Sequence, residues 1–199
     1  MAITYLVLGT APAEEEFVDL IDDSLGDLDD ALGVDLTYVD LQDRGEHLLV
    51  HVYEAPDNEV RVSVVKDDRT PVGYLAVEAP TQELLDNVST FLRDRLPVQD
   101  LETLRSSARR DIPENPGALV KLAIASDEPD ETTEGIIRDA LKSDDPSVLS
   151  AAVEAAGLTR WPSFAGVLAD YYAQHPDREI RELSGRALNA LVMGNPSRS

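Results

Sequence analysis

The chain has 199 residues, no cysteine, and 39 Asp and Glu against 17 Lys and Arg, which gives a formal net charge of −22. Such a charge disfavours nucleic acid phosphates and anionic lipid as partners, and the lack of cysteine excludes disulfides, thiol catalysis and Cys-ligated zinc. The sequence shows neither a run of eighteen apolar residues nor a basic N-terminal signal, so we expect a cytoplasmic protein that does not enter the membrane.

A strand and an acidic helix open the chain. Residues 3–9 are β-rich and alternate, which predicts a strand, and residues 13–32 have apolar side chains at helical spacing, which predicts a helix that ends at Gly33. Gly26 predicts fraying or a kink inside this helix. Its outer face is almost purely carboxylate, and the acids on it that we select as candidate partner-binding residues are Glu15, Glu16, Asp19, Asp22, Asp23, Asp27 and Asp30.

Four further strands are predicted over residues 35–41, 46–54, 59–66 and 72–78. Short connections that contain Gly, Pro, Asp and Asn separate them, which indicates antiparallel hairpins. Alternation predicts two buried sets of side chains, one of Leu48, Val50 and Val52 and the other of Val60, Val62 and Val64.

A second helix is predicted over residues 81–96, with Thr81 as its N-cap. Residues 1–96 are therefore interpreted as an α+β domain, an antiparallel five-stranded sheet with two helices on one face. The sequence predicts a second domain over residues 97–199, where strand signals vanish and Ala and Leu dominate.

The second domain shows a repeated pattern. Asn115-Pro116, Asp145-Pro146 and His175-Pro176 recur every thirty residues, and each pair is followed by an apolar helix and preceded by another helix. A fixed period with two helices per unit is typical of an α-solenoid, here with about three helix pairs. Proline is favoured in a first helical turn because its missing N–H has no partner there.

The stretch from Ile136 to Val148, followed by Ala151, Ala152, Ala155 and Ala156, resembles the turn between the two helices of a HEAT repeat. The resemblance covers roughly residues 101–192 and implies a surface, lined by the second helix of each unit, that binds other macromolecules. On this chain the implied surface would include Lys121, Glu154, Arg178, Arg181, Glu182 and Arg186. Leu149 stands where the family usually has Arg, and the third unit has a longer turn, which leaves the unit boundaries open.

The sequence contains no recognisable catalytic or metal-binding pattern, so we predict no enzyme activity, no cofactor and no metal. His47 and His51 lie four residues apart in a predicted strand, about 13 Å from end to end, which is too far for one ion. The third histidine, His175, falls in a turn between helices. No serine nucleophile elbow, phosphate loop or dinucleotide fingerprint is present. An EF-hand calcium loop that starts at Asp27 is not predicted, because Ala31 and Leu32 occupy the positions of the next ligand and of the glycine.

Two aromatic positions have alternative interpretations. Trp161 precedes Pro162 and is either a packing residue between repeat units, which we favour, or an interface anchor. Tyr171 and Tyr172 are adjacent in a predicted helix, so one ring should point inward and the other outward. We select Tyr172, with Arg178 and Arg181, as further candidate partner-binding residues.

The leading hypothesis is a non-catalytic protein that docks a basic protein partner, because residues 1–99 hold 22 acids and 6 bases. In acidity and fold type the chain resembles bacterial immunity proteins, which implies an inhibitor of a cationic toxin or nuclease. The alternative is a secretion-type chaperone or adaptor that forms a homodimer through the sheet or through the helix of residues 81–96. A halophilic or GC-rich background would also make a protein acidic, but it predicts acids spread over both halves, whereas residues 100–199 hold 17 acids and 11 bases.

Overall fold

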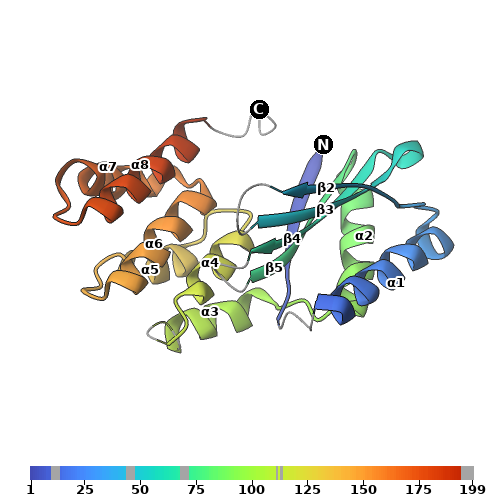
Figure 1. Cartoon of the computed structure of the whole chain (residues 1–199), viewed down its shortest axis with the longest axis horizontal. Coiled ribbons are helices and arrows are strands. Elements are labelled where there is room, and N and C mark those ends of the chain that lie inside the picture. The colour runs from blue at the N-terminus through green and yellow to red at the C-terminus, as the bar shows by residue number, and fades with distance from the viewer. Residues whose placement is uncertain (10–13, 44–47, 68–71, 111, 113, 194–199) are drawn as a thin grey trace. The chain divides into compact units, whose positions relative to one another are not determined.

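The computed structural model describes residues 1–9, 14–43, 48–67, 72–110, 112 and 114–193 (Figure 1). The chain divides into two compact units, an N-terminal unit, Met1–Gln99, and a C-terminal unit, Asp100–Ser199. The N-terminal unit is α+β and the C-terminal unit is helical throughout its described secondary structure, which confirms the predicted fold class. The turns expected at residues 43–45 and 67–71 fall largely outside the described residues.

The sheet of the N-terminal unit has five antiparallel strands in the order β1-β5-β4-β3-β2. Strands β1 and β2 therefore form the two opposite edges of the sheet, although β2 is the next strand after β1 in the chain. The strand bounds are β1 Ala2–Val7, β2 Thr37–Asp43, β3 Leu48–Ala55, β4 Val60–Asp67 and β5 Val72–Ala79. Each lies within about two residues of its predicted range because the alternation and the Gly, Pro, Asp and Asn connections both mark strand ends.

Helices α1 (Glu14–Leu32) and α2 (Gln82–Arg95) pack on one face of this sheet. Their apolar stripes meet the sheet in one core. The side chains of this core that each helix contributes are Ile21, Leu25 and Leu28 from α1 and Leu85, Val88 and Leu92 from α2. The prediction of two helices on one face is therefore confirmed.

The ends of both helices follow the local sequence signals. Gly33 ends α1 with a left-handed φ of 65°, a conformation that glycine adopts without strain. The Thr81 side chain caps α2 by accepting a hydrogen bond from the Leu84 N–H at 3.3 Å. Gly26 does not interrupt α1, which runs continuously from Glu14 to Leu32, because the buried residues on both sides of Gly26 hold the helix to the sheet.

The two predicted sets of buried strand residues lie on opposite faces of the sheet. Val62 of β4 pairs with Tyr53 and faces the helices, whereas Val50 of β3 pairs with Val65 and faces the other way. A smaller apolar cluster forms on that second face around Val50, Val52 and Val65. The sheet is consequently apolar at its centre on both sides, rather than on the helix side alone.

The C-terminal unit consists of three consecutive helix pairs in its described part (Figure 1). The bounds are α3 Leu101–Arg110, α4 Gly117–Ile124, α5 Glu131–Ala140, α6 Pro146–Thr159, α7 Ala165–Gln174 and α8 Arg178–Met193. Helix α4 packs on α6 and α6 packs on α8, so the second helices of the pairs form a continuous row. This arrangement is compatible with a helical repeat, with a short 3₁₀ turn, Pro162–Phe164, before α7.

Small residues allow the second helices to approach closely. A Cβ added at Gly157 of α6 would lie 2.8 Å from the Cβ of Ala187 on α8, which is closer than carbon atoms tolerate. The buried face of α6 carries Ala151, Ala152, Ala155 and Ala156 beside this glycine. The Ala-rich composition that marked this half in the sequence therefore sets the spacing of the helices.

Aspartate side chains cap four of the six helices, and at α8 Asp177 accepts from the Glu179 N–H at 2.7 Å. Asp100 accepts from the Thr103 N–H at 2.7 Å, Asp130 from the Thr133 N–H at 2.8 Å, and Asp145 from the Ser147 N–H at 2.8 Å. Hydrogen bonds from Thr103 lower the pKa of Asp100, and those from Ser147 lower the pKa of Asp145. Partial burial opposes the shift at Asp130, but hydrogen bonds from Thr133 and the guanidinium of Arg105 lower its pKa as well.

These shifts predict a loss of stability in acid. A carboxyl with a lowered folded-state pKa stabilises the fold above its unfolded pKa, about 3.9 for Asp, and that contribution disappears as the pH falls through the folded value. We expect Asp130→Asn, which keeps an N-cap acceptor but loses the charge that pairs with Arg105, to be less stable than wild type at pH 7 by about 1 kcal/mol. The difference in the free energy of unfolding should shrink below about pH 4. Urea unfolding followed by Trp161 fluorescence measures it, and a difference that stays constant between pH 7 and pH 3 contradicts the assignment.

Among the described residues, no helix combines the length and apolar character that crossing a membrane requires.

Candidate partner-binding site

The outer face of α1 is the candidate site that the sequence singled out. Asp23, Asp27 and Asp30 are exposed and follow the spacing i, i+4, i+7, which places them in one stripe of the helix. Asp22 and Asp29 are exposed beside them. Glu15, Glu16 and Asp19 belong to α1, but their side chains lie outside the described part. Because Ile21, Leu25 and Leu28 bury the opposite face, the stripe is held facing away from the sheet.

Two carboxylates of this helix also have partners within the N-terminal unit. The Tyr53 hydroxyl on β3 donates to Asp22 Oδ1 at 2.5 Å, and Arg95 of α2 pairs with Asp27 across 3.3 Å. Burial, reinforced by the Asp22 carboxylate, raises the pKa of Tyr53 well above its usual value, so the tyrosine remains a donor. The exposed Arg95–Asp27 pair contributes at most about 1 kcal/mol. Asp22 and Asp27 thus orient α1, and the remaining acids of the stripe are left for a partner.

Arg178, Arg181 and Tyr172, the candidates in the C-terminal unit, are not equally accessible. Arg181 Nη1 donates to the backbone carbonyls of His175 at 2.6 Å and Pro176 at 3.0 Å, so its guanidinium holds the turn between α7 and α8. Arg178 is exposed and pairs with Glu182 at 2.7 Å.

The predicted division between the two tyrosines is confirmed. Tyr171 is half-buried and its hydroxyl donates to the Leu141 carbonyl, whereas Tyr172 points outward with 57% of its surface exposed. Tyr172 lies over Gly185 of α8, where an added Cβ would meet the ring at 3.0 Å. The Tyr172 ring therefore lies against α8 at Gly185 while more than half of its surface faces solvent.

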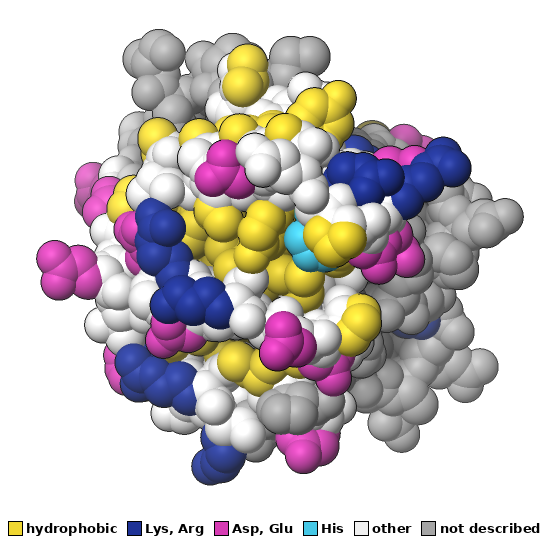
Figure 2. Space-filling model, turned by 90° about the vertical axis from the view of Figure 1, so that its left-hand side faces the viewer, with side chains coloured by type: hydrophobic (Ala, Val, Ile, Leu, Met, Phe, Trp, Pro, Cys, Tyr) yellow, Lys and Arg dark blue, Asp and Glu magenta, His cyan; other side chains and the backbone are white. Residues whose placement is uncertain are grey.

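Figure 2 looks at the C-terminal unit from the side of α7. Hydrophobic side chains gather near the middle of this face, and acidic and basic side chains are interspersed around them. The surface differs from α1, where the described exposed charges are all acidic. Lys121 of α4, which the HEAT resemblance placed on the binding surface, is partly buried, and burial lowers its pKa.

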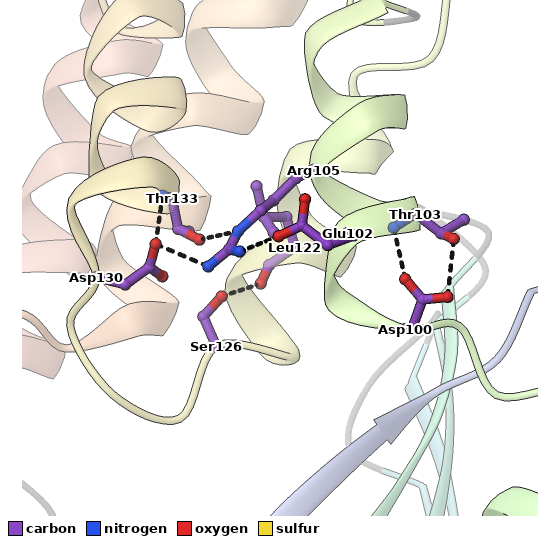
Figure 3. Close-up of polar contacts among 8 residues, drawn as sticks. All are labelled: Asp100, Glu102, Thr103, Arg105, Leu122, Ser126, Asp130 and Thr133. Atoms are coloured by element: carbon purple, nitrogen blue, oxygen red, sulfur yellow. Dashed lines mark hydrogen bonds and ion pairs between the residues drawn. The ribbon is translucent and has the colours of Figure 1, made fainter.

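A polar network between α3 and α5 was not predicted from the sequence (Figure 3). Arg105 of α3 pairs with Asp130 at 2.8 Å, donates to Thr133 Oγ1 at 3.2 Å, and also binds Glu102. Thr133 is completely buried and the Arg105 side chain is only 15% exposed. The network joins residues 28 positions apart, so no local pattern could have revealed it. Its position between two helices indicates a role in fixing their spacing.

A groove of about 680 Å³ lies elsewhere between α3 and α5. Its apolar lining includes Ala108 and Ile136, and its charged lining includes Arg109, Asp139 and Lys142. Lys142 pairs with Asp139 at 2.7 Å, and the Ser143 hydroxyl accepts from the Asp145 N–H at 3.2 Å. These contacts assign Lys142, Asp139 and Ser143 to local structure.

The histidines show no catalytic or metal-binding arrangement in the described part of the chain. His47 lies outside it. His51 on β3 packs against the Tyr38 ring with centroids 6.2 Å apart, and His175 Nδ1 accepts from the Asp177 N–H at 3.2 Å. No group of three His, Asp or Glu side chains suited to a metal occurs among the residues described. Asp27 and Asp29, the start of the rejected calcium pattern, lie inside α1 rather than in a loop.

Trp161 is a packing residue, as the favoured interpretation predicted. It is 2% exposed and stacks on Phe164 with ring centroids 6.1 Å apart and an interplanar angle of 12°. The interface-anchor interpretation is therefore excluded for this residue, because a partner cannot reach its ring.

Exposed apolar residues on β2 were not selected from the sequence. Tyr38, Val39 and Leu41 are 54%, 53% and 49% exposed, and β2 is an edge strand. The sequence shows these apolar residues in a predicted strand, but it does not show which strands pair with that strand in the sheet. Edge position, which depends on the sheet order, decides that these side chains face solvent.

Comparisons with protein-family models, with curated proteins and with solved structures found no match to this chain.

Proposed function

We propose that this protein is a non-catalytic binding protein that docks a basic protein partner through the outer face of α1. The observation that carries the proposal is the exposed stripe of α1, in which Asp27 pairs with Arg95 and Asp23 and Asp30 face solvent, on a helix whose opposite face is anchored in the core. The N-terminal unit has 22 acids and 6 bases, so its field attracts a cationic surface over a longer range than the stripe alone. In the finer form of the proposal, the protein is of the immunity or inhibitor type and neutralises a cationic toxin or nuclease.

The proposal has a physical signature in salt dependence. Exposed charges are screened beyond about 10 Å at 0.1 M salt, so association should slow steeply as salt rises from 0.05 to 0.3 M, by roughly tenfold or more. Dissociation should change less, because it depends on contacts that form after the encounter.

The test is a pull-down from the native host at both salt concentrations, followed by association kinetics with the captured partner. We expect the double variant Asp23→Lys/Asp30→Lys to reduce the association rate by about tenfold or more. The matched control, Glu128→Lys/Asp144→Lys, makes the same change in net charge at exposed positions of the C-terminal unit and should have a much smaller effect. A partner held equally at both salt concentrations, or equal effects of the two double variants, argues against docking at α1.

A homodimeric chaperone or adaptor is the second candidate. The exposed apolar side chains of the β2 edge favour it, whereas the outward positions of α2 are polar or charged. Light scattering distinguishes the two, because this candidate requires twice the monomer mass.

A further inference from the structure

The two edges of the sheet differ in whether another segment of the chain pairs with them. The outer edge of β1 is paired at its C-terminal end, where the chain returns after α2: Gly9 N–H donates to the Pro97 carbonyl at 2.9 Å, and Gln99 N–H donates to the Val7 carbonyl at 2.8 Å. Leu8 and Val98 form the bridge between these bonds. The outer edge of β2 has no strand against it among the described residues. An uncovered edge presents backbone donors and acceptors to any extended chain that reaches it.

The side chains of β2 define what such a chain must look like. Tyr38 pairs with Tyr53 and Leu41 with His51, which places both on the side of the sheet that the helices cover. Asp40 pairs with Val52 and faces the other side. The register shift between Tyr38 and Asp40 marks a bulge at Val39. A strand added here would meet apolar groups on one of its faces and a carboxylate on the other.

We propose that the β2 edge is extended by a strand of the basic partner, a segment that alternates apolar residues with Lys or Arg. Backbone hydrogen bonds to β2 would provide affinity for any extended segment. The alternation of apolar and basic side chains in the partner strand would then select its register on β2. The inference rests on the proposed function, because it specifies how the same basic partner is held.

A second copy of this chain fits the edge less well. Antiparallel pairing of two β2 strands about their centre, Asp40, brings two carboxylates into opposition, and like charges directly across a strand pair are destabilising. The N-terminal unit, with its 22 acids and 6 bases, would also repel its own copy. A strand with Lys or Arg opposite Asp40 reverses both effects.

The β2 edge is continuous with the acidic helix. The Tyr38 ring contacts the Tyr53 ring edge-on with centroids 5.4 Å apart, and the Tyr53 hydroxyl reaches Asp22 of α1 at 2.5 Å. A partner strand on β2 would therefore lie on the same side of the unit as Asp22 of α1. Residues that flank the strand could then pair with the carboxylates of the stripe without any rearrangement of the sheet.

The probe for this proposal is a fluorescein-labelled nonapeptide of alternating Lys and Val with blocked ends, titrated with the full chain and followed by fluorescence anisotropy. We expect Leu41→Lys to weaken binding by at least about tenfold, since lysine on an edge strand opposes strand addition. Leu158→Lys changes an equally exposed leucine of α6, 44% against 49%, and should leave binding unchanged. A second probe, N-methylated at alternate residues, keeps the charges but cannot form the ladder, and it should also bind at least about tenfold more weakly.

The outcomes separate this inference from the proposed function. Binding that survives both Leu41→Lys and N-methylation, but is lost in Asp23→Lys/Asp30→Lys, overturns strand addition and leaves docking at α1 standing. A protein dimer that Leu41→Lys converts to a monomer also overturns it, because the edge is then occupied by a second copy. Failure of the unmethylated probe to bind overturns strand addition alone, whereas the pull-down decides the proposed function. The N-methylated probe uses the wild-type chain, so a folding defect of the variant does not affect that comparison.

Discussion

Replacing Trp161 with Ala should lower the free energy of unfolding of the C-terminal unit by about 3–5 kcal/mol, the usual cost of truncating a buried aromatic side chain. Trp161 is 2% exposed and stacks on the fully buried Phe164. Removal of the indole leaves a cavity that the surrounding helices cannot fill, since their closest approach is already set by small residues such as Gly157. Urea unfolding followed by far-UV circular dichroism measures the loss without needing the tryptophan itself.

Two controls make this prediction specific. Trp161→Phe keeps an aromatic ring against Phe164 and removes an indole N–H that finds no acceptor among the described residues, so it should cost far less than Trp161→Ala. Leu158→Ala truncates a side chain that is 44% exposed near the end of α6, three residues before Trp161, and should cost less than about 1 kcal/mol. If Trp161→Ala is no more destabilising than Leu158→Ala, the ring does not anchor this core.

The second large effect is expected at Arg105. Arg105→Ala should destabilise the C-terminal unit by about 2–4 kcal/mol, because it leaves the partly buried Asp130 and the buried Thr133 hydroxyl without their shared donor. Trp161 is the only tryptophan in the chain, so its fluorescence reports the unfolding of this unit in urea.

The matched control for Arg105 lies on the same helix. Arg109→Ala removes an exposed guanidinium from α3 and should change the free energy of unfolding by less than about 0.5 kcal/mol. A double-mutant cycle between Arg105→Ala and Asp130→Ala should give a coupling of about 1 kcal/mol or more. Additive effects within about 0.3 kcal/mol would show that the pair does not act as a unit.

Much of the fold could be predicted because each element carries local signals. Helix α1 ends at the predicted Gly33, and α2 begins after the predicted cap Thr81. Hairpin connections placed the strands for the same reason. The disagreement at Gly26 has a tertiary cause: packing of Ile21 and Leu28 against the sheet outweighs the roughly 1 kcal/mol cost of a glycine in a helix.

The candidate site was predictable in composition but not in its contacts. The spacing of apolar residues in α1 indicated that Asp23, Asp27 and Asp30 would share one exposed stripe, and they do. The same spacing could not reveal that Asp22 binds Tyr53, 31 residues away, or that Arg181 is occupied by carbonyl groups in the α7–α8 turn. These contacts depend on which helices, strands and turns pack together, and the spacing of residues along the chain does not predict that packing.

The sequence by itself determined where helices and strands begin and end, and which face of α1 is carboxylate, because turn chemistry and side-chain periodicity act over a few residues. Only the tertiary structure decided that β2 is an edge strand of the sheet, that Val50 and Val62 face opposite sides of the sheet, and that Arg105 joins α3 to α5. Those features arise from the order in which strands and helices pack, and the packing order is set by contacts between residues far apart in the chain.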